Sequence, residues 1–174
     1  MGQYFSIVNL DKEQYFSPSI FNEGVKYSTI MSGVAQSYVL GRLLISSNEH
    51  NDSNPLIGVW AGDRIVIPSD ESGSFEEFGH QQESIIFNDS IRTRYQNIGG
   101  KIICEFITDN YFSKLIADKV RNDHIYFTQL GYIVYKYPDQ SISLRKFLTD
   151  LFGMDWEKQM KKKSKSSFIE PDVD

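Results

Sequence analysis

The chain has 174 residues, a formal net charge of −5 and one cysteine. This length allows one substantial hydrophobic core, the acidic balance argues against a protein that coats nucleic acid, and a single cysteine excludes an intramolecular disulfide. The aromatic content of 14% favours strands whose side chains are half buried. We therefore expect a single α+β domain in which a few helices pack on an antiparallel sheet.

The first half of the chain predicts strands at Tyr4 to Asn9 and Gln14 to Phe16, joined by a turn. A helix is predicted from Ser32 to Ser46, because apolar residues recur there at helical spacing. Leu56 to Ile67 gives the clearest hairpin pattern in the chain, with Gly62-Asp63 as a two-residue turn that tolerates positive φ angles.

The second half is harder to assign. Lys101 to Ile107 is predicted as a strand, although its apolar residues also fit a helix, and Asn110 to Val120 is predicted as a helix. His124 to Tyr137, interrupted by Gly131, predicts a strand pair or one long bulged strand because it is rich in aromatic and β-branched residues. Ser143 is the expected cap of a final core helix.

Beyond Gly153 the chain becomes charged and lysine-rich. Asp155 to Lys163 can extend the preceding helix, and lysines near its end would suit the negative end of the helix dipole. We expect residues 1–153 to form the globular α+β domain and residues 154–174 to form a basic C-terminal helix extension and tail.

Two stretches carry a recognisable pattern. The chain opens MGQYFSIVNLDKEQY, and residues 58–70 read GVWAGDRIVIPSD. Together they resemble an uncharacterised family of small proteins in bacteria, phages and some eukaryotes, which open MGQYY, continue NLDKxEY and contain a WAGDxIVIAGD core. The resemblance covers about residues 1–95 and departs from the family pattern at Pro68-Ser69, where the family has Ala-Gly. It implies a shared fold for the first half and assigns no catalytic residue.

The segment around the predicted hairpin turn is the main candidate for ligand binding. The Trp60 ring, the Asp63 carboxylate and the Arg64 guanidinium could grip a small polar ligand at the tip. In the structural alternative, which we favour, Trp60 anchors the core, Gly62-Asp63 makes the turn and Arg64 is solvated, since such turns require this dipeptide in any case.

The remaining reactive residue types give little support for catalysis or cofactor binding. Cys104 has apolar neighbours and an acidic one, so we expect it to be buried and unreactive. His50, His80 and His124 lack the spacing of a zinc site. We expect no catalytic residue, no metal and no cofactor, and we lean against an enzyme.

The N-terminus and the hydropathy pattern bear on location. No basic region followed by an apolar run marks a signal peptide, and no apolar stretch reaches the length of a membrane helix. We therefore expect an intracellular protein, cytoplasmic or in a virion, that is not secreted. Gly2 with Ser6 fits an N-myristoylation pattern, although the segment also fits the first strand. Membrane contact is expected only if Gly2 is acylated.

These observations favour a non-catalytic protein-interaction or structural component of a larger viral or cellular assembly. The residues expected to dock on a protein partner are in the basic tail: Lys161, Lys162, Lys163, Lys165, Phe168 and Ile169. Nucleic acid is not expected as a partner, given the acidic body. One alternative is a small-ligand-binding protein or enzyme that uses the Trp60–Arg64 hairpin with carboxylates of the neighbouring acidic loop. Another is a peripheral membrane protein held by an acyl chain and lysines.

Overall fold

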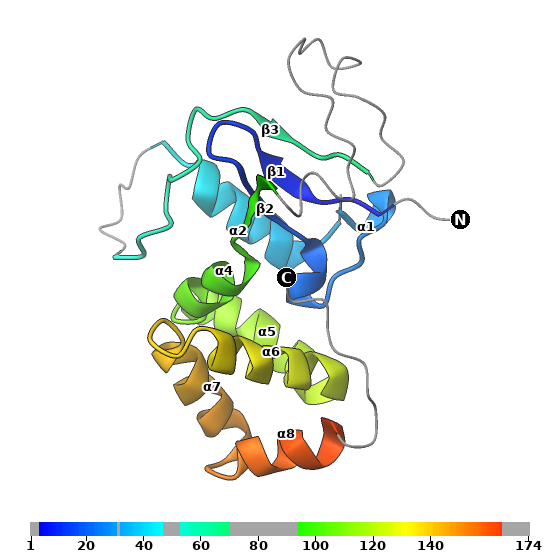
Figure 1. Ribbon diagram of the computed structural model, residues 1–174, viewed down its shortest axis with the longest axis vertical. Coiled ribbons are helices and arrows are strands. Elements are labelled where there is room, and N and C mark those ends of the chain that lie inside the picture. Colours follow the sequence, from blue (N-terminus) through cyan, green and yellow to red (C-terminus); the bar gives the residue numbers. More distant parts are fainter. Residues whose placement is uncertain (1–3, 31, 47–52, 70–93, 165–174) are drawn as a thin grey trace. The chain divides into compact units, whose positions relative to one another are not determined.

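The structure is a computed structural model that describes residues 4–30, 32–46, 53–69 and 94–164 (Figure 1). These residues form helices and one mixed four-stranded sheet, so the α+β class predicted from the sequence is confirmed. Contacts within the chain cluster into two compact units, Met1–Gly99 and Gly100–Asp174. The predicted boundary after residue 153 stays a prediction.

The sheet belongs to the first unit and has the strand order β3-β1-β2-β4. Its strands are β1 (Ile7–Asn9), β2 (Gln14–Phe16), β3 (Ile65–Val66) and β4 (Gln96–Asn97). Strand β1 pairs antiparallel with both β2 and β3, whereas β2 and β4 run parallel. The expectation of an antiparallel sheet is therefore wrong at one edge. A parallel neighbour needs a long crossover, and β4 follows β2 by about eighty residues of sequence.

The first unit's aromatic core lies between the sheet and α2 (Val34–Leu44), which runs behind the strands in Figure 1. Phe16 of β2 stacks on Trp60, with ring centroids 5.7 Å apart, and meets Phe21 edge-on at 5.8 Å. Phe21 ends the 3₁₀ helix η1 (Pro18–Phe21), which is followed by the short helix α1 (Tyr27–Ile30). Trp60 is completely buried, which confirms its predicted role as a core anchor.

The predicted hairpin over Leu56 to Ile67 is wrong. Residues 55–62 form consecutive turns, and Gly58 and Gly62 take positive φ angles of 70° and 83°. The backbone N–H groups of Gly58 and Trp60 donate to the carbonyls of Arg42 and Leu43 at the end of α2, both at 2.9 Å. The first half of the expected hairpin therefore binds a helix end instead of a strand, and only β3 joins the sheet.

The helix predicted from Ser32 begins at Val34, and its N-terminus is capped from a distance. The Glu23 carboxylate accepts hydrogen bonds from the backbone N–H groups of Ala35 and Gln36, at 2.9 and 3.0 Å. The residue at the cap position, Gly33, has no side chain to do this. A carboxylate at this end of a helix also interacts favourably with the helix dipole.

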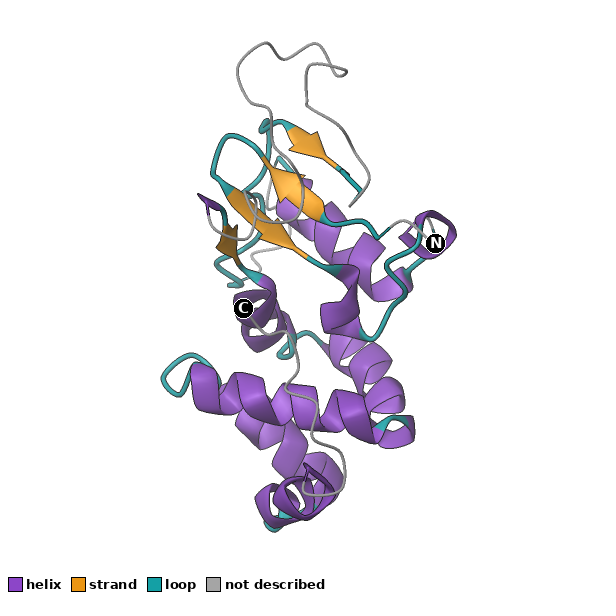
Figure 2. Cartoon of the chain, turned by 45° about the vertical axis from the view of Figure 1, so that its right-hand side comes forward, coloured by secondary structure: helices purple, strands orange, loops and turns teal. Residues whose placement is uncertain are grey.

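All described regular structure after β4 is helical (Figure 2). The helices are α4 (Gly99–Phe106), α5 (Asn110–Asn122), α6 (His124–Lys136), α7 (Ile142–Phe152) and α8 (Trp156–Ser164). The predictions of α5 and of the final core helix, α7, are confirmed, although the cap position of α7 is Ser141 and not the predicted Ser143. The predicted strands over 101–107 and 124–137 are wrong. Asp123 explains the second error, because its carboxylate accepts from the Ile125 and Tyr126 N–H groups and starts a helix.

The last helix, α8, packs on α6. Phe127 of α6 meets Trp156 of α8 edge-on at 6.4 Å. One turn later, Gly131 lies so close to Met160 that an added Cβ would overlap its Sδ atom. Gly153, with a φ angle of 81°, separates α8 from α7, so α8 is a helix in its own right instead of an extension. None of the described helices combines the length and the apolar character that a bilayer crossing requires.

Candidate functional site

The two sequence motifs of the first unit contact each other in an arrangement that we call the motif clasp: residues 9–12 against residues 60–64. At its centre is Asn9, which is completely buried at the end of β1. Its Nδ2 donates to Asp63 Oδ2 at 2.8 Å, and its Oδ1 accepts from the Asp11 and Lys12 N–H groups at 3.0 and 2.9 Å. The side chain thus shapes the β1–β2 turn and holds the second motif.

Two ion pairs complete the motif clasp. Lys12 Nζ lies 3.0 Å from Asp63 Oδ2. Arg64 donates to Asp11 Oδ1 from Nε at 2.8 Å and from Nη2 at 2.6 Å, while its backbone N–H donates to Asp11 Oδ2 at 2.7 Å. The Arg64 hydrogen bonds lower the pKa of Asp11, and the Asn9 hydrogen bond, followed by that of Lys12, lowers the pKa of Asp63.

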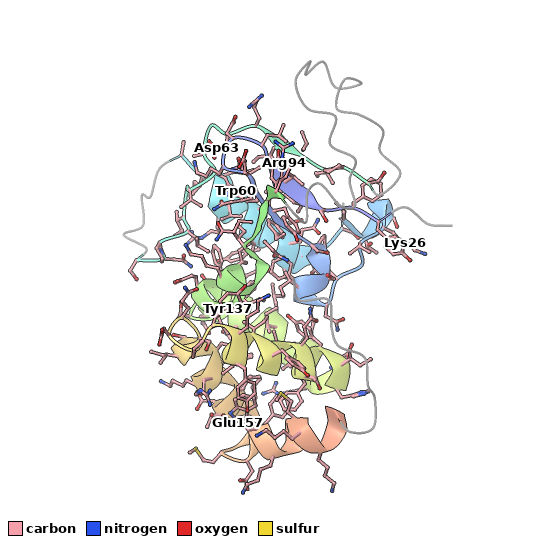
Figure 3. All side chains as sticks on the ribbon, in the orientation of Figure 1. Lys26, Trp60, Asp63, Arg94, Tyr137 and Glu157 are labelled. Atoms are coloured by element: carbon pink, nitrogen blue, oxygen red, sulfur yellow. The ribbon has the colours of Figure 1, made fainter. Side chains whose placement is uncertain are left out.

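The third candidate residue, Trp60, is also held inside the motif clasp region (Figure 3). Its Nε1 donates to Gln14 Oε1 at 2.9 Å, and its ring is covered on the Phe16 side. The sequence correctly places Trp60, Asp63 and Arg64 together, but it does not identify their partners. Each of their polar groups described above binds another residue of the first unit, so their evident role is structural. Ligand binding by these three residues stays a prediction.

Cys104 is buried in α4 with 3% of its surface exposed, as predicted. Burial, with a smaller effect of Glu105, raises the pKa of its thiol to about 12. The nucleophilic thiolate is therefore scarce at neutral pH. Within the described ranges, no group of three or more His, Cys, Asp or Glu side chains is placed to hold a metal ion.

In the second unit, α8 presents what we call the lysine face: Lys158, Lys161 and Lys162, all exposed. The neighbouring acidic residues have basic partners. Glu157 pairs with Arg145 of α7 and accepts from Tyr135 Oη of α6 at 3.1 Å, and Asp155 Oδ1 lies 2.9 Å from Lys158 Nζ. Glu157 is labelled on α8 in Figure 3.

The other predicted docking and lipidation residues have no described side chain. Lys163 lies within α8, but its side chain falls outside the description. Gly2, Lys165, Phe168 and Ile169 lie outside the described residues. Their predicted roles in docking and lipidation stay predictions.

Comparison with known proteins adds no further assignment. No family model, curated protein or solved structure matches the chain. Function must therefore be inferred from the residues and their geometry.

Proposed function

We propose that this protein is a non-catalytic interaction component of a larger assembly, and that it docks on an acidic protein partner through the lysine face and the adjoining tail. The observation that carries this proposal is the division of roles within α8. Trp156 and Met160 are buried, at 2% and 5% exposed, while Lys158, Lys161 and Lys162 point to solvent.

A packed helix is a favourable platform for such docking. Trp156 is fixed against Phe127, and the Arg145 guanidinium lies 5.9 Å from the Trp156 ring centroid. Because the α8 backbone is already ordered, binding at the lysine face costs conformational entropy only in the lysine side chains and the partner. Exposed lysines would raise the association rate with an acidic surface and make the affinity sensitive to salt.

The resemblance of the first unit to the MGQYY family fits into this proposal. The family's two motifs correspond to the two sides of the motif clasp, so the clasp would be a shared structural element. On this proposal the first unit contributes a stable fold, and the sequence from α8 onward contributes the contact with partners.

The test is capture of partners from the natural source with tagged full-length protein, followed by quantitative mass spectrometry. The variant Lys158→Glu/Lys161→Glu/Lys162→Glu reverses the lysine face. A matched control, Lys26→Glu/Lys101→Glu/Lys114→Glu, reverses three exposed lysines elsewhere.

We expect a defined set of proteins to bind the wild type and the control, to dissociate at high salt, and to be lost with the α8 variant. Thermal melting of both variants establishes that they are folded. Equal recovery with all three proteins at low and physiological salt would overturn the proposal.

A further inference from the structure

Beside the lysine face, two donors from neighbouring helices bind one carboxylate of α8. The donors are Arg145 of α7 and Tyr135 of α6, which we call the Arg145 site. The Glu157 carboxylate accepts a hydrogen bond from Arg145 Nη1 and another, at 3.1 Å, from Tyr135 Oη. Burial, followed by the Glu157 hydrogen bond, raises the pKa of the Tyr135 hydroxyl, which therefore remains a donor at neutral pH. The Arg145 site is thus a receptor for a carboxylate, and Glu157 occupies it.

The Arg145 guanidinium does not depend on Glu157 alone for its orientation. Its Cζ atom lies 5.9 Å from the ring centroid of Trp156, which is 2% exposed and packs edge-on against Phe127. A guanidinium carries five N–H donors. Among the residues that the structure describes, the Glu157 carboxylate is the only acceptor bound to this guanidinium. If Glu157 moved away, Arg145 would remain oriented by the indole, with its donors available to another carboxylate.

The ion pair between Arg145 and Glu157 is one that an external carboxylate can replace. The two side chains are 45% and 34% exposed. Pairs that are exposed to this extent contribute little to stability and are screened by salt. Lys161 lies four residues after Glu157 on α8, so the two positions are neighbours on the helix surface. An acidic segment that docks on the lysine face therefore passes within reach of the Arg145 site.

We propose that the Arg145 site belongs to the docking surface, and that Glu157 competes for it with a carboxylate of the acidic protein partner. Glu157 is then an autoinhibitory contact, which the partner displaces when it binds. This inference rests on the proposed docking function and adds to it the residues that recognise an individual carboxylate. An internal competitor lowers the apparent affinity in proportion to its occupancy of the site. For an exposed ion pair this factor is up to about fivefold.

The first test is fluorescence anisotropy of the full chain with a labelled oligoglutamate peptide, and with oligoglutamine as the uncharged comparison. We expect Glu157→Gln to tighten oligoglutamate binding about two- to fivefold, and Arg145→Gln to weaken it. Each variant has a control with the same change of charge. Asp155→Asn removes a carboxylate that precedes α8 and pairs with a lysine, and Lys146→Gln removes an exposed cation of α7. Both controls should change the affinity less.

The second test is a double-mutant cycle, which separates competition for Arg145 from a general effect of charge. In an Arg145→Gln background there is no guanidinium to release. We therefore expect Glu157→Gln to tighten binding there no more than Asp155→Asn does. The cycle is measured at low and at physiological salt. Circular dichroism and tryptophan fluorescence show whether α8 remains packed in each variant.

Effects of Glu157→Gln and Arg145→Gln that simply add would overturn the inference, and so would equal effects of Glu157→Gln and Asp155→Asn. Absence of a salt-sensitive preference for oligoglutamate, up to near-millimolar protein, would overturn it as well. The proposed docking function is judged separately, by the capture of natural partners with the lysine-face variant. Loss of those partners alongside an additive cycle would support docking and reject the role of Glu157.

Discussion

The two units differ in how their polar groups are satisfied. In the first unit the motif clasp joins residues more than fifty positions apart, as in the hydrogen bond from Asn9 to Asp63. In the second unit the capping contacts are local, since the Asp109 and Asp123 carboxylates accept hydrogen bonds from the N–H groups two and three residues later. A segment that resembles a binding site can therefore be a fold determinant, as the Trp60–Arg64 segment is. A helix without any recognisable motif can instead present exposed charged side chains, as α8 does with Lys158, Lys161 and Lys162.

The largest loss of stability is expected when Trp60, the core residue of the first unit, is removed. Trp60→Ala should reduce the free energy of unfolding by about 3–5 kcal/mol, because it removes a fully buried aromatic ring. It also removes the indole donor that binds Gln14. Equilibrium urea denaturation measures this, and Trp156→Ala gives the matching loss in the second unit. A change near zero for Trp60→Ala would contradict the anchoring role.

Two glycine-to-alanine substitutions, one in a helix of each unit, should change the free energy of unfolding by smaller amounts and in opposite directions. Gly131→Ala in α6 should destabilise by about 1–3 kcal/mol, since the new Cβ would displace Met160. Gly41→Ala in α2 is the control. A Cβ at this exposed position would meet no described atom outside the helix itself within 4 Å, so the change should stabilise by up to about 1 kcal/mol. Denaturation midpoints that move in the same direction for both variants would be inconsistent with the close α6–α8 contact.

The motif clasp should make the stability of the folded protein depend modestly on pH. The pKa values of Asp11 and Asp63 are lowered in the folded protein, so both carboxylates stabilise it while ionised. Their contribution is complete above their ordinary pKa of 3.8 and is lost as the pH falls through the lower folded values. Thermal melting between neutral and acidic pH measures it, with Asp63→Asn as the comparison. If that variant retains the full acid sensitivity of the wild type, Asp63 is not a source of it.

Thiol labelling tests the burial of Cys104 without any substitution. Cys104 should react with a thiol reagent at neutral pH far more slowly than an unfolded control, because it is buried and its pKa is raised to about 12. Time-resolved intact mass measures the modification. Labelling of the native protein as fast as of the urea-denatured protein would show that α4 exposes this residue.

Local patterns predict those parts of the fold that local chemistry determines. Helix α5 follows from the Asp109 cap and from apolar residues at helical spacing, of which Phe112 and Ile116 are completely buried. The strand prediction for 124–137 is wrong because it rests on side-chain composition and gives too little weight to the Asp123 cap, a signal that the sequence contains. Packing against α5, α7 and α8 then overrides the β-propensity of this segment.

The candidate site is predictable as a set of residues but not as a set of contacts. Trp60, Asp63 and Arg64 do lie together, yet the sequence does not identify Asn9 and Lys12 as the partners of Asp63. A pairing across more than fifty residues leaves no periodicity in the residues around either partner. The signal that could have helped is that each side of the motif clasp contains one acidic and one basic residue, which can pair crosswise, as Asp11 does with Arg64.

The distant cap of α2 has an evolutionary consequence. A Cβ atom on Gly33 would lie 2.6 Å from the Glu23 carboxylate, so a Ser or Asp at position 33 would collide with the group whose task it could take over. The helix can be capped from position 23 or from position 33, but not from both. Loss of the Glu23 carboxylate alone should therefore destabilise α2, and the same loss should cost less where position 33 carries Ser or Asp. A lineage that exchanged one cap for the other would lose least stability by changing position 33 first, because the end of the Glu23 side chain can move away from the new Cβ.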